Sequence, residues 1–310
     1  MEKRKFLIDC DTGTDDAIAI MEALYEPRAE VVACTTVDGN VEVEYTSRNT
    51  LNLIDYLGFD IPVAVGAAEG MRLRYNYHGQ DESTHGKKGL GPVVIPESQK
   101  AFSELRATQL IYEKAKECAG NLEILAIGPL TNIALALLEY PELKVLIKHL
   151  WIMGGAVYGG NVSTTAEFNI WADAEAGRVV FKSGIPLTMV GLDVTLKAVM
   201  LEEDARHLRA HNTKASNLAA ELLEFMFRRR DEGHEDAVMH DALAFAAAFC
   251  PECLRTEKLY VDVECAGEYT WGHTFADLRG RLGRPANADV ALGIDVEKFR
   301  KYLLDCYDRS

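Results

Sequence analysis

The chain has 310 residues, of which 48% are hydrophobic, so it can bury a sizeable core. Its net charge of −15 argues against nucleic acid as a partner, because a phosphate-backbone binder needs a basic face. The first residues carry no long apolar stretch, and the longest apolar segment, 242–250, is too short to span a bilayer, so we expect neither a signal peptide nor a membrane partner. The seven scattered cysteines indicate reduced thiols and a cytoplasmic protein.

Short apolar runs alternate with helical patterns from the start of the chain. In chain order the patterns predict a strand at 6–8, a helix at 17–24, a strand at 31–37, a helix at 43–57 and a strand at 61–65. Residues 66–96 are rich in Gly, His, Tyr and charge and show no clear period. A long loop of this kind inside a compact domain is usually functional or disordered.

The alternation resumes after this loop. The patterns predict a helix at 101–119, a strand at 122–127, a helix at 128–138, strands at 150–153 and 186–190, helices at 173–182, 217–230 and 236–249, a late strand at 259–264 and a closing helix at 296–307. Strands alternating with helices predict an α/β fold, a Rossmann-like three-layer sandwich with a mostly parallel sheet and extra C-terminal helices. We see no linker or repeat, so residues 1–310 are expected to form a single domain.

Four aspartates gather where the first strand ends, and ligands of such sheets bind beyond the carboxyl ends of the strands. Asp9 and Asp11 share a face of the strand, and Asp15 and Asp16 fall at the start of the next helix. Helix capping could explain Asp15 or Asp16, but not all four. Carboxylates this close repel one another unless a cation lies among them, and hard oxygen ligands suit Ca²⁺ or Mg²⁺.

Three other acidic or phosphate-binding loops fit this segment less well. An EF-hand loop beginning at Asp9 would need an acidic residue at its twelfth position, which is Ile20, and a ligand at Gly13. A haloacid-dehalogenase-type phosphatase also opens with a strand and DxD, but an apolar residue should follow where Gly13 stands. A P-loop needs a Gly-Lys-Ser/Thr ending, which the sequence lacks here.

The acidic segment resembles the signature of the inosine-uridine-type nucleoside hydrolases. Residues 9–17, DCDTGTDDA, are similar to that family's DxDPGxDDA, with Thr12 where the family commonly has a proline that supplies no ligand. Further matching motifs follow in order along nearly the whole chain: TTVDGN (35–40), HGKKGLG (85–91), GPLTN (128–132), MGG (153–155) followed by Asn161, AEFN (166–169), DAEA (173–176) and HD (240–241). Each motif alone is weak, but together in this order they are strong.

The resemblance implies a role for each matching residue. It implies that Ca²⁺ is held by Asp11, Asp16, the backbone carbonyl of Ile127 and Asp241, and that Asp11 is also the general base. It assigns the grip on the ribose to Asp15, Asn40, Asn161, Glu167 and Asn169, with Met153 lining the sugar. Asp9 would orient the cluster, His240 would act on the leaving base, and His85 would lie in the loop near it. Relatives of this kind are usually homodimers or homotetramers.

Hydrolysis of an N-glycosidic bond needs such groups. A water attacks C1′ while the base leaves an oxocarbenium-like ribosyl group, which nearby carboxylates stabilise. A bound Ca²⁺ lowers the pKa of that water, and an aspartate takes its proton. We therefore predict calcium-dependent hydrolysis of purine or pyrimidine ribonucleosides to ribose and free base, in nucleoside salvage or catabolism. A non-catalytic ribonucleoside-binding protein and a metal-dependent phosphatase are the alternatives.

Several of these residues also have a purely structural interpretation. His240 lies in an apolar helical run and could be a core histidine, and His85 could be an exposed loop residue. Glu167 and Asn169 could be turn or capping residues, although strand-type i, i+2 spacing would aim both inward. Trp171 is expected in the core rather than against a base.

Residues 228–230 are three consecutive arginines in the segment that contacts the nucleobase in related enzymes. We favour the interpretation that they form a solvated helix end, where cations suit the helix dipole. The alternative is an altered base pocket for a modified or charged substrate. Tyr75, Tyr77 and His78 in the long loop are candidates to close over the base.

Overall fold

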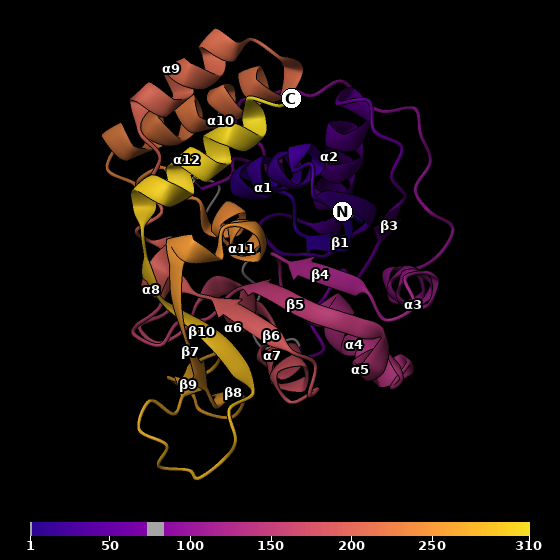
Figure 1. Cartoon of the computed structure of the whole chain (residues 1–310), viewed down its shortest axis with the longest axis vertical. Coiled ribbons are helices and arrows are strands. Elements are labelled where there is room, and N and C mark those ends of the chain that lie inside the picture. The colour runs from indigo at the N-terminus through magenta and orange to yellow at the C-terminus, as the bar shows by residue number, and fades with distance from the viewer. Residues whose placement is uncertain (1, 73–83) are drawn as a thin grey trace.

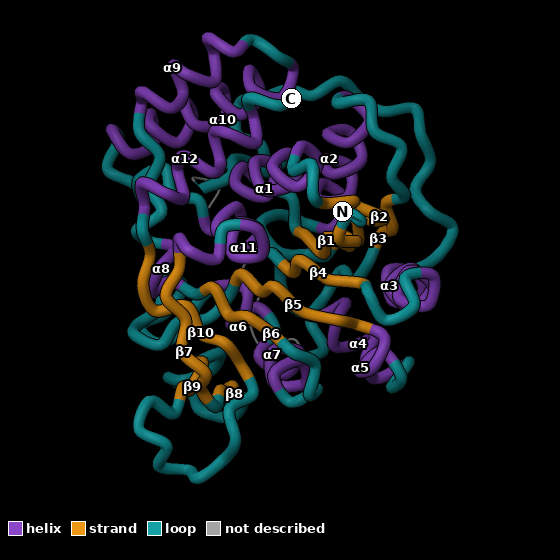
Figure 2. The backbone as a smooth tube through the Cα atoms, viewed as in Figure 1, coloured by secondary structure: helices purple, strands orange, loops and turns teal. Residues whose placement is uncertain are grey.

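The structure is a computed structural model that describes residues 2–72 and 84–310. Within these ranges, eight strands form a central sheet in the order β3-β2-β1-β4-β5-β6-β10-β7 (Figure 2). Neighbouring strands are parallel except β10 and β7, which are antiparallel. The strands are β1 (Arg4–Cys10), β2 (Ala29–Thr36), β3 (Val63–Val65), β4 (Leu122–Ala126), β5 (Ile147–Met153), β6 (Leu187–Val190), β7 (Leu254–Leu259) and β10 (Ala288–Ile294).

Helices cover both faces of this sheet, as Figure 1 shows. The side chains of β1 alternate between the two faces: Phe6 and Ile8 belong to one buried apolar cluster and Leu7 to the other. The first cluster includes residues of α1 (Thr14–Tyr25), α2 (Val43–Tyr56), α8 (Leu192–Thr195), α9 (Glu202–His211), α10 (Lys214–Asp231), α11 (His240–Phe249) and α12 (Val296–Tyr307). The second includes residues of α3 (Ala107–Glu117), α4 (Thr131–Glu139), α5 (Leu143–Leu146), α6 (Phe168–Ala172) and α7 (Ala174–Phe181). The predicted α/β sandwich with extra C-terminal helices is confirmed.

Three expected elements differ most from the structure. The helix expected from residue 101 begins only at Ala107, because the preceding segment is tied to β3 by a hydrogen bond from the Ser103 N–H to the Val63 carbonyl. The helix expected from residue 236 begins at His240, because Val238 forms a β-bridge with Val199. The strand expected at 259–264 is divided between two sheets: β8 (Val261–Val263) leaves the central sheet and pairs with β9 (Thr274–Ala276).

The turn between β1 and α1 brings the acidic segment to the carboxyl edge of the sheet. Gly13 is the extended N-cap residue of α1, and its backbone N–H donates to Asp16 Oδ2 at 2.9 Å. A carboxylate at this place satisfies an N–H that the helix itself cannot. Asp16 is therefore fixed by the start of the helix.

None of the described helices combines the length and the apolar character needed to cross a membrane.

Candidate active site

A cavity of about 780 Å³ opens at the carboxyl edge of the sheet, a size typical of small-molecule sites. Most of the predicted site residues line it: Asp15, Asn40, His85, Ile127, Met153, Asn161, Glu167, Asn169, His240 and Asp241. Asp9, Asp11 and Asp16 lie behind this lining and are buried. The fold thus brings together residues that are up to 232 positions apart in the chain, from Asp9 to Asp241.

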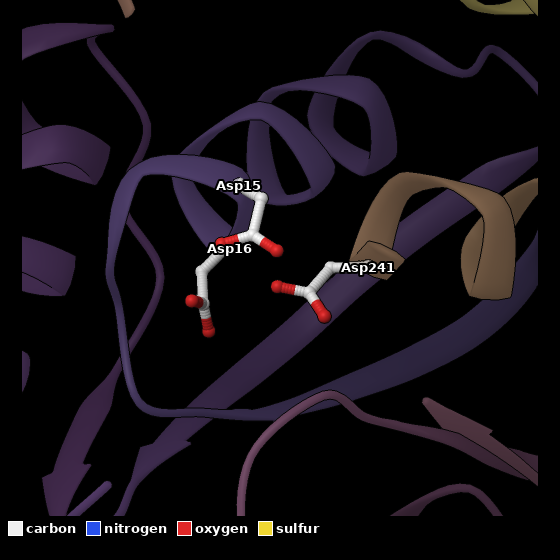
Figure 3. A group of neighbouring side chains, drawn as sticks. All are labelled: Asp15, Asp16 and Asp241. Atoms are coloured by element: carbon white, nitrogen blue, oxygen red, sulfur yellow. The ribbon is translucent and has the colours of Figure 1, made fainter. Parts of the chain in front are cut away.

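Three carboxylates meet at the floor of the cavity. Asp15 and Asp16 come from the start of α1 and Asp241 from the start of α11, and Figure 3 shows them converging on one space. One oxygen from each lies within 4.8 Å of the others. Two oxygens on opposite sides of a Ca²⁺ lie about 5 Å apart, so this spacing fits such an ion. The spacing of the four aspartates placed Asp15 in a cation cluster, whereas the family resemblance assigned it to the ribose.

Asp11 is held beside these carboxylates by backbone contacts. Its Oδ2 accepts the Asn40 N–H at 2.8 Å, whereas its buried Oδ1 has no hydrogen-bond partner among the described residues. Two glycines leave room for it: a Cβ at Gly39 would lie 2.0 Å from Oδ2, and one at Gly128 would lie 2.8 Å from Oδ1. The glycines of TTVDGN and GPLTN therefore make space for the Asp11 carboxylate.

The electrostatics of this group also fit a cation. Burial raises the pKa of Asp11 and Asp241 well above the usual value and that of Asp16 to about 7, and repulsion among the aspartates adds to each increase. Among the ion pairs of residues 2–72 and 84–310, none joins a lysine or arginine to these carboxylates. A divalent cation would relieve both the burial cost and the repulsion.

Asp9 lies in β1, two residues before Asp11, and has a supporting position. Its Oδ1 accepts hydrogen bonds from the Thr35 hydroxyl and, at 2.8 Å, from Asn132 Nδ2. Asn132 also donates to the Thr36 carbonyl at 2.9 Å, so it links β2 and α4 to Asp9. Burial, which these hydrogen bonds only partly offset, raises the pKa of Asp9 to about 7.

A second group of polar residues stands where β5 leads to α6. Glu167 is the N-cap of α6: its Oε1 accepts the Asn169 N–H and its Oε2 the Gly155 N–H, both at 2.8 Å. Asn169 Nδ2 donates to the Ile127 and Met153 carbonyls at 3.1 and 3.2 Å. The expected strand-type spacing of Glu167 and Asn169 is wrong, because Asn169 lies in a helix, yet both side chains are buried against the cavity.

Asn161 is placed by the same turn. Its Oδ1 accepts the Phe168 N–H at 3.0 Å. The capping interpretation of Asn161 and Glu167 therefore describes real hydrogen bonds, and both residues also line the cavity.

Two histidines stand at the other side of the cavity. His240 Nδ1 lies 2.8 Å from the Thr195 hydroxyl, and its Nε2 lies 4.0 Å from Glu235 Oε2. Burial opposes the charged imidazolium, but Glu235 and then Asp15 outweigh it and raise the pKa of His240. Thr195 and Glu235 were not among the predicted site residues, although Thr195 follows the carboxyl end of β6 closely enough for the strand-end rule to find it.

His85 covers the start of α1. Its Nδ1 accepts the Thr14 backbone N–H at 3.2 Å and lies 4.0 Å from Asp15 Oδ1. A Cβ at Gly13 would lie 2.5 Å from this nitrogen, so the glycine permits the close approach.

The geometry agrees with comparisons to known proteins. The sequence model of the inosine-uridine preferring nucleoside hydrolase family matches residues 6–301. The chain belongs to this family. As a nucleoside hydrolase it cleaves ribonucleosides, which argues against the non-catalytic binding protein and the phosphatase as alternatives.

Curated relatives extend over almost the whole nucleoside hydrolase chain. The non-specific ribonucleoside hydrolase RihC of Klebsiella pneumoniae (strain 342) is 40% identical over 296 residues, which cover 96% of this chain and 95% of the relative. The pyrimidine-specific ribonucleoside hydrolase RihA of Escherichia coli O17:K52:H18 is 40% identical over 303 residues, 96% of each chain. Among solved structures, a purine-preferring ribonucleoside hydrolase from Gardnerella vaginalis superposes with a TM-score of 0.90 at 32% identity, covering 99% of this chain and 100% of its own.

Two residues of the nucleoside hydrolase cavity differ from expectation, Arg229 on α10 and Trp171 on α6. Arg229 lines the cavity, whereas Arg228 is exposed and Arg230 is paired with Glu202, so the solvated helix end describes only the outer two arginines. Trp171, expected in the core, also lines the cavity. Tyr75, Tyr77 and His78 lie outside the described residues.

Proposed function

We propose that this nucleoside hydrolase is calcium-dependent and hydrolyses purine or pyrimidine ribonucleosides to ribose and free base in nucleoside salvage or catabolism. The observation that carries the proposal is the group of buried carboxylates at the cavity floor, which are mutually repulsive, have raised pKa values and are spaced for one hard cation. Residues 1–310 would act as one domain, since both apolar clusters pack on one sheet. A homodimer or homotetramer and a cytoplasmic location stay predictions.

Asp11, Asp16, the carbonyl of Ile127 and Asp241 would hold the ion. Asp16 and Asp241 offer oxygens within the 4.8 Å group, and Asp15 stands close enough to share in it. The free Oδ1 of Asp11 is one of the orphaned buried oxygens that a cation would satisfy. When bound, Ca²⁺ would lower the pKa of a water and fix its position.

Asp11 would be the general base. The Asn40 N–H fixes its Oδ2, so the carboxylate is held in place to accept a proton from the attacking water. The water oxygen forms a bond to C1′ of the ribose as the bond from C1′ to the base nitrogen breaks, and the electron pair leaves with the base.

The ribose would be gripped between two groups of residues. Asp15 and Asn40 approach from the α1 side, and Asn161, Glu167 and Asn169 from the β5–α6 side, with Met153 beneath. Carboxylates near the sugar stabilise the positive charge that develops as the base departs. The same groups can hydrogen-bond the ribose hydroxyls, which favours ribose over deoxyribose.

His240 would donate a proton or hydrogen bond to the leaving base. Its Nδ1 is engaged by Thr195, its Nε2 faces Glu235 at 4.0 Å, and its raised pKa favours the protonated ring that can donate. His85, at the rim of the same cavity, would lie close to the base.

A nucleoside panel tests the proposed reaction. The protein is mixed with Ca²⁺ and inosine, uridine, cytidine or adenosine, and release of reducing sugar is followed. We expect ribose from at least one of these substrates. No reducing sugar from any of them would overturn the proposed function.

A further inference from the structure

One arginine of the triplet is built into the cavity wall. Arg229 lies in the last turn of α10 and lines the cavity together with Met226, which stands one turn earlier on the same face. Its guanidinium lies 5.9 Å from the centre of the Phe225 ring. Arg230, by contrast, turns outward to Glu202 and Asp231 at 3.1 and 2.8 Å.

The electrostatic neighbours of Arg229 belong to the base-facing part of the cavity. The exposed Glu235 also lines the cavity, and its pKa is lowered by His240 first and then by Arg229 and His85. His240 Nε2 itself lies 4.0 Å from Glu235 Oε2. Arg229 and the two histidines therefore line the same cavity and all act electrostatically on Glu235.

This wall is separate from the residues that would hold the ribose. Asn161, Glu167 and Asn169 come from the turn before α6 and from α6 itself, whereas Arg229 comes from α10. In Figure 1 these two helices lie far apart in the view, with α11 between them. A nucleoside whose ribose lies at α6 would turn its base toward the end of α10.

We propose that Arg229 is a further catalytic residue, whose guanidinium donates hydrogen bonds to an acceptor atom of the leaving nucleobase and stabilises the negative charge it gains. This inference rests on the proposed hydrolysis. Arginine stays charged at all working pH values and presents a planar set of N–H donors that matches carbonyl and ring-nitrogen acceptors.

The movement of electrons to the leaving base explains why the positively charged Arg229 guanidinium would lower the barrier. When the bond from C1′ to the base nitrogen breaks, both electrons go to the base, and the charge spreads onto its carbonyl oxygens or ring nitrogens. Arg229 stabilises that charge without giving up a proton, and the base nitrogen is protonated by His240 or by solvent. Bases with a carbonyl or ring-nitrogen acceptor on the side of α10 benefit most, because the acceptor becomes more negative in the transition state.

The test compares natural nucleosides with 4-nitrophenyl riboside, whose leaving group is already stable as an anion. For Arg229→Gln we expect kcat/KM to fall roughly 10- to 100-fold with uridine or inosine, the range for loss of one hydrogen bond to a charged group. With 4-nitrophenyl riboside we expect a change of less than about threefold, because little charge is left to stabilise. Arg229→Lys keeps the charge but not the planar donors, so its loss should be intermediate.

Arg228→Gln is the matched control, because Arg228 lies next to Arg229 on the same helix turn and is exposed. It should leave both activities within about twofold of the wild type. Equal slowing of both substrates by Arg229→Gln, or no slowing of either, would overturn the assignment and leave the proposed function intact. Failure of the wild-type protein to cleave either substrate would overturn the proposed function and this assignment with it.

Discussion

Helix α1 carries buried acidic side chains at both ends, and their surroundings differ. At its start, Asp15 and Asp16 meet Asp241 at the floor of an open cavity. Near its end, Glu22 is fully buried, and neither carboxyl oxygen has a hydrogen-bond partner among the described residues. Its electrostatic neighbours include Glu26 and, on α12, Tyr307.

Burial raises the pKa at both ends, so a raised pKa alone does not mark a functional site. The start of α1 differs because several carboxylates converge there, one oxygen of Asp11 is left free, and a cavity gives access. Glu22 does not line the cavity at the sheet edge, and its burial favours the neutral acid. Two features distinguish a candidate cation site from a lone buried acid: several carboxylates converge, and a cavity lets an ion reach them.

Removal of Asp11, the proposed general base, should have the largest effect on activity. Asp11→Ala is expected to lower kcat for ribose release by roughly 10²- to 10⁴-fold, the range for loss of a general base. The measurement is reducing-sugar release under saturating nucleoside, with thermal melting to show that the variant is folded. A variant that kept full activity would contradict the assignment of Asp11.

Calcium should stabilise the folded protein through the carboxylates at the start of α1, and Glu22 near the end of the helix should not contribute. With Ca²⁺ at about 100 times its dissociation constant, the wild type should gain about 2.7 kcal/mol over the protein in chelator, and Asp241→Asn should lose most of this gain. Thermal melting with and without Ca²⁺ measures it. Glu22→Gln is the matched control and should keep the full gain. Equal gains in all three proteins would place the ion elsewhere.

Replacing the Glu22 carboxyl group with a neutral amide should stabilise the protein. The pKa of Glu22 is raised in the folded state, so its contribution to stability is complete below the unfolded pKa of about 4.3 and is lost as pH rises through the folded value. Glu22→Gln should therefore raise the free energy of unfolding at pH 8 by about 1 to 3 kcal/mol, with a smaller gain at pH 5. Urea unfolding at both pH values measures the difference.

Glu26 provides the control with the opposite sign. Burial alone would raise its pKa, but hydrogen bonds from Arg28 hold it below the usual value. Glu26→Gln should therefore lower stability at pH 8. If Glu22→Gln also destabilised the protein at pH 8, the description of Glu22 as an uncompensated buried acid would be wrong.

The smallest effect is expected from loss of the Thr195 hydroxyl, which contacts His240. Thr195→Val removes the hydroxyl 2.8 Å from His240 Nδ1 and should lower kcat about tenfold, with KM little changed. Thr195→Ser restores a hydroxyl and should recover most of the activity. Equal activity of the valine and serine variants would show that this contact does not position the histidine.

The sequence predicted the strands β1 to β6 and most helices because buried parallel strands and amphipathic helices leave periodic apolar patterns, but it missed β10. It could not predict that the helix at residue 236 is delayed to His240, since the bridge between Val238 and Val199 joins positions far apart in the chain. The break between β7 and β8 was missed for the same reason, because β8 finds its partner in β9.

The candidate site was foreseen unevenly. Asp11, Asp16 and Asp241 were found by motif, and the fold brings them to one place. Of the three consecutive arginines, only Arg229 lines the cavity. Which of them does so depends on how α10 is rotated about its axis, and three identical residues in a row do not reveal this. The lone buried Glu22 was also not foreseen, since its helix positions look like any amphipathic pattern.

Calcium titration of the metal-stripped protein tests the central claim most directly. The wild type and Asp16→Ala are treated with chelator, dialysed and titrated with Ca²⁺ in a calorimeter, and ribose release is followed in the same samples. We predict that the wild type binds calcium stoichiometrically and regains activity as it does so, whereas Asp16→Ala does neither. Stoichiometric calcium binding by Asp16→Ala, or full activity of the stripped wild type before calcium is added, would contradict the account.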